Sequence, residues 1–130
     1  MKSLFLAVVL VLSIWTNAFA WLSMGPADDG SVNYILMESK RWIAPDIVQA
    51  WIKVDFTQST DPQHKQLKES VGLEQINCVT KQTRYLDFTI YYRDGTSVTA
   101  DPTPSKWINI FSDTMAARWY IKLCGQTSLH

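Results

Sequence analysis

The 130-residue chain contains few of the residues from which catalytic and metal sites are usually built. It has two histidines, two cysteines and five glycines, and it contains neither a Gly-x-Ser-x-Gly nor a His-Glu-x-x-His sequence. His64 is the one histidine away from the C-terminus, and a catalytic or metal role would need partner residues that the sequence does not cluster around it. We therefore expect no catalytic site, no metal and no cofactor. A small hydrolase is the remaining enzymatic alternative.

The chain also lacks an excess of either charge. Twelve basic residues balance twelve acidic ones, whereas domains that bind nucleic acid through its phosphates carry a basic excess. The same balance disfavours an anionic membrane as a bulk partner. We therefore expect a protein partner and no nucleic acid.

Long apolar runs are missing apart from one near the N-terminus. Lys2 precedes an apolar run over 4–14, which is shorter than the roughly 20 residues of a membrane-spanning helix. Residues 18–20 read Ala-Phe-Ala and place small residues at positions −3 and −1 of a cleavage site. This pattern predicts a secretory signal peptide over 1–20 and a single domain over 21–130. The alternative is that the segment stays uncleaved as an anchor.

Export from the cytoplasm would determine whether the two cysteines can form a disulfide. A cleaved chain would be periplasmic, or secreted to the cell surface, without stable membrane insertion. No cysteine stands at the cleavage point, so we expect no lipoprotein anchor. An oxidising compartment favours a disulfide between Cys78 and Cys124. The alternative is two buried free thiols.

Alternating apolar residues predict an antiparallel sheet. The clearest period of two runs over 47–56, where the side chains of one set are all apolar and Trp51 lies on the opposite face. Asp94-Gly95 between two β-rich runs predicts a hairpin. We expect further strands over 21–24, 32–35, 71–80, 83–92 and 97–100, a short apolar segment over 107–110, a connection broken by Pro45 over 40–46, and a long loop or short irregular helix over 57–69.

The C-terminal part predicts the one clear helix. Ser112 is the expected N-cap, Met115, Trp119 and Leu123 share one face, and Gly125 ends the helix. The predicted fold class is therefore α+β, with an antiparallel sheet of about six strands and one C-terminal helix packed on it, stapled by the disulfide.

Two groups of residues are candidates for binding a partner. His64, Lys65, Lys68 and Lys81 form a basic run that could meet an acidic partner, and an ordinary solvated face is the alternative. Trp51 becomes a binding hot spot if its face of the sheet is uncovered, and the alternative is that the helix buries it. We expect Arg84, which lies inside a β-rich segment, to pair with a buried carboxylate or carbonyl.

Several of these segments resemble the surface-adhesin protein E-like family in their order along the chain. The resemblance covers nearly all of 21–130. The matching segments are Trp21, Asp28-Asp29-Gly30, Val32 to Ile35, Val48 to Phe56, Gln75 to Cys78 with Arg84, Tyr91 to Gly95, Trp107 to Ile110 and Leu123 to Gly125.

The resemblance implies a six-stranded antiparallel sheet with a C-terminal helix, a Cys78–Cys124 bridge, an ability to form a homodimer and no catalytic site. It gives Arg84, Gly95 and Trp107 structural roles and places ligand binding near the basic run. The best-known member of the family is a bacterial adhesin for host matrix and serum proteins. This chain departs from that member in lacking its lipoprotein cysteine and in a shorter middle loop.

These inferences predict an extracytoplasmic, non-enzymatic binding module for host matrix or serum proteins. The alternative is a periplasmic accessory protein, either an inhibitor or an assembly subunit, that acts on an endogenous bacterial partner.

Overall fold

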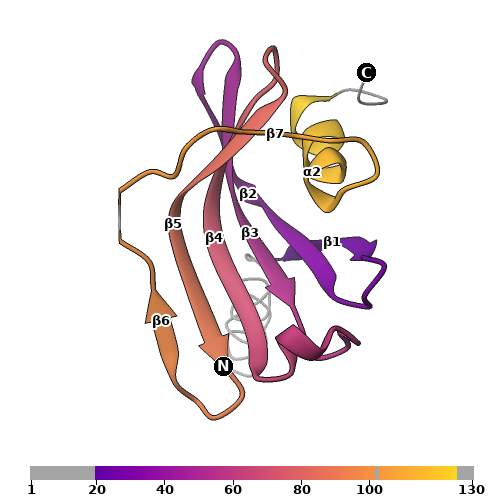
Figure 1. The fold of residues 1–130 in the computed structure, drawn as a ribbon. Coiled ribbons are helices and arrows are strands. Elements are labelled where there is room, and N and C mark those ends of the chain that lie inside the picture. Colours follow the sequence, from indigo (N-terminus) through magenta and orange to yellow (C-terminus); the bar gives the residue numbers. More distant parts are fainter. Residues whose placement is uncertain (1–19, 102, 126–130) are drawn as a thin grey trace, which may run out of the picture.

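The computed structural model describes residues 20–101 and 103–125, and the predicted signal peptide over 1–20 lies almost wholly outside them. Within these residues, the sheet is antiparallel and has seven strands rather than about six. The strands are β1 (Trp21–Pro26), β2 (Val32–Ala44), β3 (Ile47–Asp55), β4 (Leu67–Asn77), β5 (Gln82–Tyr92), β6 (Ser97–Thr99) and β7 (Ile108–Asn109). Strands β1 to β6 follow sequence order across the sheet, and β7 also pairs with β5 (Figure 1).

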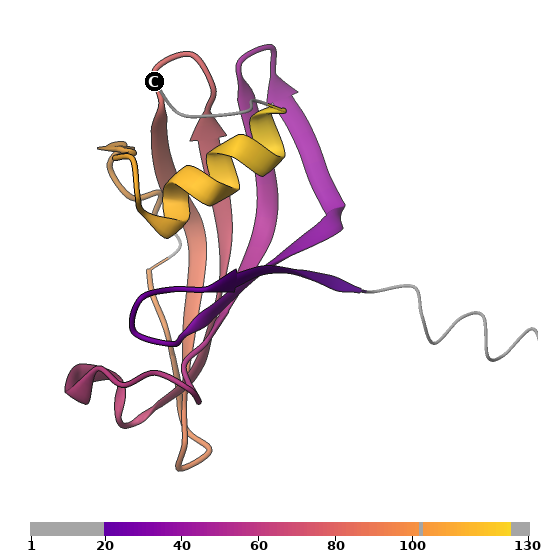
Figure 2. The same ribbon diagram turned by 90° about the vertical axis from the view of Figure 1, so that its right-hand side faces the viewer.

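Strand β2 is longer than expected, so the predicted connection over 40–46 is wrong. The register shifts between Leu36, opposite Trp51, and Arg41, opposite Gln49. Ser39 fills this bulge, because its hydroxyl accepts the Trp51 N–H at 2.9 Å and donates to the Leu36 carbonyl at 2.5 Å. β2 bends sharply along its length, as bulged strands do (Figure 2).

The core lies between one face of the sheet and helix α2 (Met115–Cys124), which crosses in front of the strands in Figure 2. Strand β3 presents Val48, Ala50 and Ile52 to this core, and the prediction of its apolar face is confirmed for these three residues. The complete buried cluster is Ile35, Val48, Ala50, Ile52, Ile76, Ile110, Ala117, Tyr120 and Leu123.

The helix begins two residues later than predicted. Thr114, and not Ser112, is the N-cap, and its hydroxyl accepts the Ala117 N–H at 3.2 Å. The fully buried residues of the helix are Ala117, Tyr120 and Leu123. Of the predicted face, Leu123 is buried, Trp119 is half-buried against the core, and Met115 lies at the margin. Gly125 ends the helix in the left-handed region, as expected.

The disulfide joins the last residue of α2 to the turn that follows β4. Cys78 and Cys124 are bonded, with their Cα atoms 5.8 Å apart. The Cys78 N–H also donates to the Asp46 carbonyl at 2.8 Å, and the Tyr120 hydroxyl donates to the Cys78 carbonyl at 3.3 Å. The bridge therefore fixes the helix and two hairpin turns at one end of the sheet.

We refer below to the two ends of the sheet by name. The hairpin end comprises residues 40–47 and 77–82 and the helix terminus over 122–125. The loop end comprises residues 27–31, 56–66 and 93–96, which connect the opposite ends of the strands.

Candidate protein-binding surface

The connection from β3 to β4 forms a shaped loop at the loop end. It contains the single 3-10 turn η1 (Pro62–His64), in agreement with the predicted loop or short irregular helix, but it ends at residue 66 because β4 starts at Leu67. The Thr60 N–H donates to the Asp29 carbonyl at 2.6 Å. The loop is thereby joined to the turn between β1 and β2.

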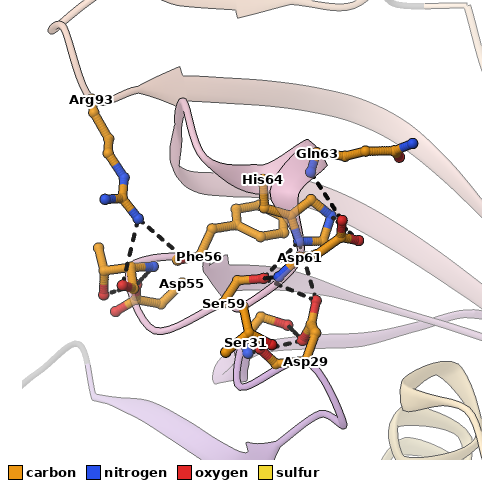
Figure 3. A network of polar contacts seen from close by, with 11 residues as sticks. Asp29, Ser31, Asp55, Phe56, Ser59, Asp61, Gln63, His64 and Arg93 are labelled. Carbon is orange, nitrogen blue, oxygen red and sulfur yellow. Dashed lines mark hydrogen bonds and ion pairs between the residues drawn. The ribbon is translucent and has the colours of Figure 1, made fainter.

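His64 lies at the centre of a polar network that holds this loop (Figure 3). Its Nδ1 lies 2.9 Å from the Ser59 hydroxyl and 3.1 Å from a carboxylate oxygen of Asp29. Its ring packs against the Phe56 ring with centroids 4.7 Å apart. His64 is therefore half-buried, and it positions the loop.

Asp29 anchors the same network from the neighbouring turn. Hydrogen bonds from the Ser31 hydroxyl, at 2.6 Å, and the Ser31 N–H, at 2.9 Å, lower the pKa of Asp29, and His64 acts in the same direction. Gly30 has a φ of 90°, and a Cβ there would collide with the Gln58 carbonyl. The turn therefore requires glycine at this position.

The network includes serine, histidine and aspartate, but its geometry differs from that of a catalytic triad. In a triad the serine and the carboxylate use different imidazole nitrogens, whereas Ser59 and Asp29 both approach Nδ1 of His64. Asp29, Asp61 and His64 offer ligand atoms within 4.8 Å of one another. However, Asp61 faces Nε2, at 3.8 Å, so the two carboxylates do not converge on one ring nitrogen.

The predicted basic run does not form a single surface. His64, Lys65 and Lys68 lie at or beside the loop end, whereas Lys81 lies in the turn after β4 at the hairpin end. The 11 residues of β4 separate the two groups, and a strand of that length spans roughly 35 Å. A partner at the loop end can thus meet the first three residues only.

Arg84 lies on the face of the sheet opposite α2. Its Nε donates to Oε1 of Gln75 at 2.9 Å, and its guanidinium stacks over the Trp107 ring at 4.4 Å. Gln75 in turn donates to Gln49 at 3.0 Å. The acceptor is a side-chain amide carbonyl, and these contacts link β3, β4 and β5 to the segment before β7.

Gly95 occupies the β5–β6 turn with a φ of 90°.

Trp51 lies on this same outer face, and the alternative that α2 covers it is wrong. The helix packs on the Val48 and Ala50 side of β3, and residues at odd positions of β3 point the other way. Trp51 is half-buried between its strand partners Leu36 and Leu73.

Lys53 extends this patch toward the loop end. Its ammonium group lies 4.7 Å from the Trp21 ring centroid and 4.9 Å from that of Tyr34. We define the outer-face patch as Trp21, Tyr34, Leu36, Trp51, Lys53 and Leu73.

A partly buried carboxyl group lies on the helix side of the sheet. Glu74 accepts a hydrogen bond from the Thr83 hydroxyl at 3.3 Å, and within the described residues no cation lies at ion-pair distance from it. Burial raises the pKa of Glu74 to about 7 against the opposing effect of Thr83. Glu74 and Trp119 line a cavity of about 420 Å³, and the buried Trp119 Nε1 has no hydrogen-bond partner within the described part of the chain.

Sequence reasoning missed the network at the loop end, although a signal for it exists. Aspartate followed two residues later by serine or threonine occurs in four turns, and in each the carboxylate accepts both the N–H and the hydroxyl of the later residue. The pairs are Asp29 with Ser31, Asp55 with Thr57, Asp94 with Thr96 and Asp101 with Thr103. Three of the four pairs lie at the loop end or next to it.

Comparisons with known proteins agree on one family. A family model described as surface-adhesin protein E matches residues 21–125. No curated protein sequence matches the chain.

Solved structures of Haemophilus influenzae protein E share the fold. One is 18% identical, with 81% of this chain and 83% of that chain covered and a TM-score of 0.53. Its selenomethionine form is 15% identical, with coverages of 84% and 87% and a TM-score of 0.55. A second crystal form is 17% identical, with coverages of 72% and 80% and a TM-score of 0.53.

Proposed function

Because this chain belongs to the surface-adhesin protein E family, we propose that it binds host matrix or serum proteins as an extracytoplasmic, non-enzymatic module. The observation that carries the proposal is the loop over 57–66, which the His64 network fixes in one shape at the loop end. We propose that this loop and the adjoining outer-face patch form the binding surface.

The loop suits protein recognition because it is already ordered. Binding a flexible loop would cost the conformational entropy of fixing it. Here Asp29 and Ser59 hold His64 from one side, and Phe56 packs against its ring. Lys65 and Lys68 stay exposed beside the network and are free to meet an acidic surface.

The outer-face patch continues from the loop. Asp55, the last residue of β3, lies on the same face as Lys53 and Trp51. Tryptophan and tyrosine, as in this patch, are enriched among binding hot spots. A partner that covers the loop would therefore also reach Lys53 and the rings beneath it.

The test is binding of the purified exported protein to an immobilised panel of matrix and serum proteins. We expect saturable binding, and a Lys65→Glu/Lys68→Glu variant should lose about tenfold in affinity because it reverses two exposed charges. Lys106→Glu/Lys122→Glu is the matched control, since it reverses two exposed lysines outside the loop end. Equal losses in the two double variants would contradict a loop-end surface.

Trp51→Ala tests the second part of the surface. We expect about a tenfold loss of affinity, and a melting curve shows whether the sheet itself has been weakened. Unchanged affinity with a normal melting temperature would remove the outer-face patch from the binding surface.

The projecting shape of the loop also supports a periplasmic accessory role. The segment that carries η1 stands out from the sheet in Figure 2, as a segment that enters the cleft of an enzyme would. Co-purification with an endogenous periplasmic enzyme, and no binding to the panel, would favour this role over adhesion. Sedimentation velocity of the same sample tests the homodimer that the family resemblance implies.

A further inference from the structure

The hairpin end exposes large apolar side chains that folding does not explain. Trp42 is 52% exposed, Ile43 is 48% exposed and Val79 is 66% exposed. The first two precede the β2–β3 turn, and Val79 lies in the β4–β5 turn. Apolar residues gathered at one tip, rather than scattered singly, mark an interaction site.

The two turns form one projection. Ile47 pairs with Asn77 across β3 and β4, and the Cys78 N–H bonds to the Asp46 carbonyl at 2.8 Å. Both views show the two hairpin tips side by side, beyond the rest of the sheet (Figures 1 and 2). The disulfide to Cys124 holds this projection against the helix.

The charge of the chain is balanced overall but is unevenly distributed. The hairpin end carries Lys40, Arg41, Lys81 and Lys122 against Asp46. The loop end carries Asp28, Asp29, Asp61 and Asp94 against Lys65 and Arg93. A near-zero net charge therefore hides a basic tip and an acidic opposite end.

Two cations of the tip, Lys40 and Arg41, are available to an outside partner. Among the residues that the structure describes, the Arg41 guanidinium donates to the carbonyls of Glu38 and Lys40. The Lys40 ammonium lies 5.5 Å from the Trp42 ring centroid. Across residues 20–101 and 103–125, neither cation has a carboxylate at ion-pair distance.

We propose that the hairpin end docks on the surface of an anionic phospholipid bilayer. Trp42, Ile43 and Val79 enter the boundary between headgroups and acyl chains, and Lys40 and Arg41 contact the phosphates. Tryptophan with neighbouring lysine or arginine suits this boundary, because the ring takes the apolar side and the cation stays in the polar layer. Docking of this kind is peripheral, and the described residues contain no helix long enough to span a membrane.

The shape of the tip favours a membrane over a protein partner. Stable protein interfaces bury about 800 Å² on each partner, which needs a broad or concave surface. Two narrow hairpin tips offer a small convex contact instead. The lipids of a fluid bilayer can rearrange to surround such a contact. The proposal is independent of the proposed function, which uses the opposite end of the sheet.

Co-sedimentation with lipid vesicles tests the proposal. The sample is the processed protein recovered from cells, with its N-terminus sequenced so that an uncleaved apolar segment cannot cause the binding. We expect binding to vesicles of phosphatidylcholine with 30% phosphatidylglycerol, as a probe composition of about one-third anionic lipid, and much weaker binding to phosphatidylcholine alone. Added salt should weaken the binding through screening.

Two matched pairs of variants locate the contact. Trp42→Ser/Val79→Ser should lose about tenfold or more in vesicle affinity. Val98→Ser, which changes another exposed valine, in β6, should not. Lys40→Gln/Arg41→Gln should lose about 25-fold at low salt, from about fivefold for each charge. Lys65→Gln/Lys68→Gln at the loop end should change little.

Three outcomes would overturn the proposal. The first is no binding of the wild-type protein to either vesicle. The second is binding that the hairpin-end variants leave intact while their melting temperatures stay normal. The third is a wild-type protein that ignores vesicles but loses a protein partner in Trp42→Ser/Val79→Ser, which would assign the tip to a protein.

Discussion

The two ends of the sheet are held in place by different chemistry. At the loop end, carboxylates such as Asp29 and Asp94 accept hydrogen bonds from the backbone and hydroxyl groups of their own turns. At the hairpin end, the Cys78–Cys124 bridge and the Tyr120 hydroxyl bind the turns to the helix. The loop end thus depends on ionised carboxylates, whereas the hairpin end, which exposes apolar side chains beside its cations, depends on an oxidised disulfide.

A simple antiparallel meander can carry two different surfaces, one at each end of its sheet. Each hairpin turn of the sheet lies at one end or the other, so alternate turns gather at opposite ends. Polar turns that saturate their own backbone groups can display a shaped loop in water. Turns that a disulfide fixes to a helix can keep apolar side chains exposed, because the bridge prevents the turns from folding over to bury those side chains.

Removal of the disulfide should have the largest effect and act at the hairpin end. The bridge closes a separation of 46 residues, and its loss in Cys78→Ser/Cys124→Ser should lower the free energy of unfolding by about 2–4 kcal/mol. Thermal melts with and without reductant measure this. A melting temperature that neither the substitutions nor the reductant changes would show that the bridge contributes nothing.

Glu74 lies between the two ends and should make the whole sheet sensitive to pH. Its pKa is raised from 4.5 to about 7, so the folded state binds its proton more tightly than the unfolded state does. The contribution of Glu74 to the free energy of unfolding is therefore fully present below about pH 4.5. It is lost as the pH rises through 7, and the loss amounts to up to about 3 kcal/mol. Glu74→Gln keeps an acceptor for Thr83 and should abolish the decline.

Chemical denaturation of the wild type and of Glu74→Gln between pH 4 and pH 8 measures that difference. If the free energy of unfolding varied with pH in the same way for the two proteins, the raised pKa of Glu74 would be contradicted.

Asp29→Ala should loosen the loop end and leave the hairpin end unchanged. The substitution removes the acceptor of two Ser31 hydrogen bonds and of contacts with Ser59 and His64, at a cost of about 1–3 kcal/mol. Hydrogen exchange should quicken over 57–66 and not over 77–82. Exchange that quickens equally at both ends would contradict the separation of the two ends.

Acid should act on the wild type in the same direction as Asp29→Ala. The pKa of Asp29 is lowered by its Ser31 hydrogen bonds, so its contribution is present above the ordinary carboxyl pKa and is lost as the pH falls below it. Reductant, in contrast, should loosen 77–82 first.

Gly95→Ala should have the smallest effect. Gly95 has a φ of 90°, but a Cβ there would meet no atom within 4 Å, so only the backbone strain counts, about 1 kcal/mol. The β5–β6 hairpin should fray without a change at the hairpin end, as amide exchange over 89–99 would show. A loss as large as that of the disulfide would mean that this turn has a further role.

Local patterns predicted much of the fold. Alternation identified the core face of β3 through Val48, Ala50 and Ile52, and the turn chemistry of Asp94-Gly95 identified the β5–β6 hairpin. The extension of β2 past Leu36 was missed because a bulge breaks the period of two. The helix start was missed because Ser112 and Thr114 are both good caps. Asp113, between them, has a left-handed φ of 67°, so the helix starts after it with Thr114 as its cap.

The candidate surface was less predictable because it depends on contacts between distant turns. The sequence separates Asp29 from His64 by a complete strand pair, so no local pattern indicated the contact between their side chains. Alternation placed Trp51 opposite the apolar face of β3, but only the three-dimensional position of α2 decided which face is covered. Lys81 and Lys65 are near in the sequence, yet β4 carries them to opposite ends.

We propose that the loop end, and not the hairpin end, binds a protein partner. The most direct test is binding of the matrix and serum panel by the wild type, Lys65→Glu/Lys68→Glu and Trp42→Ser/Val79→Ser. The first double variant should lose about tenfold in affinity, and the second should bind like the wild type. Loss of binding in the hairpin-end variant, with the loop-end variant unaffected, would contradict this proposal.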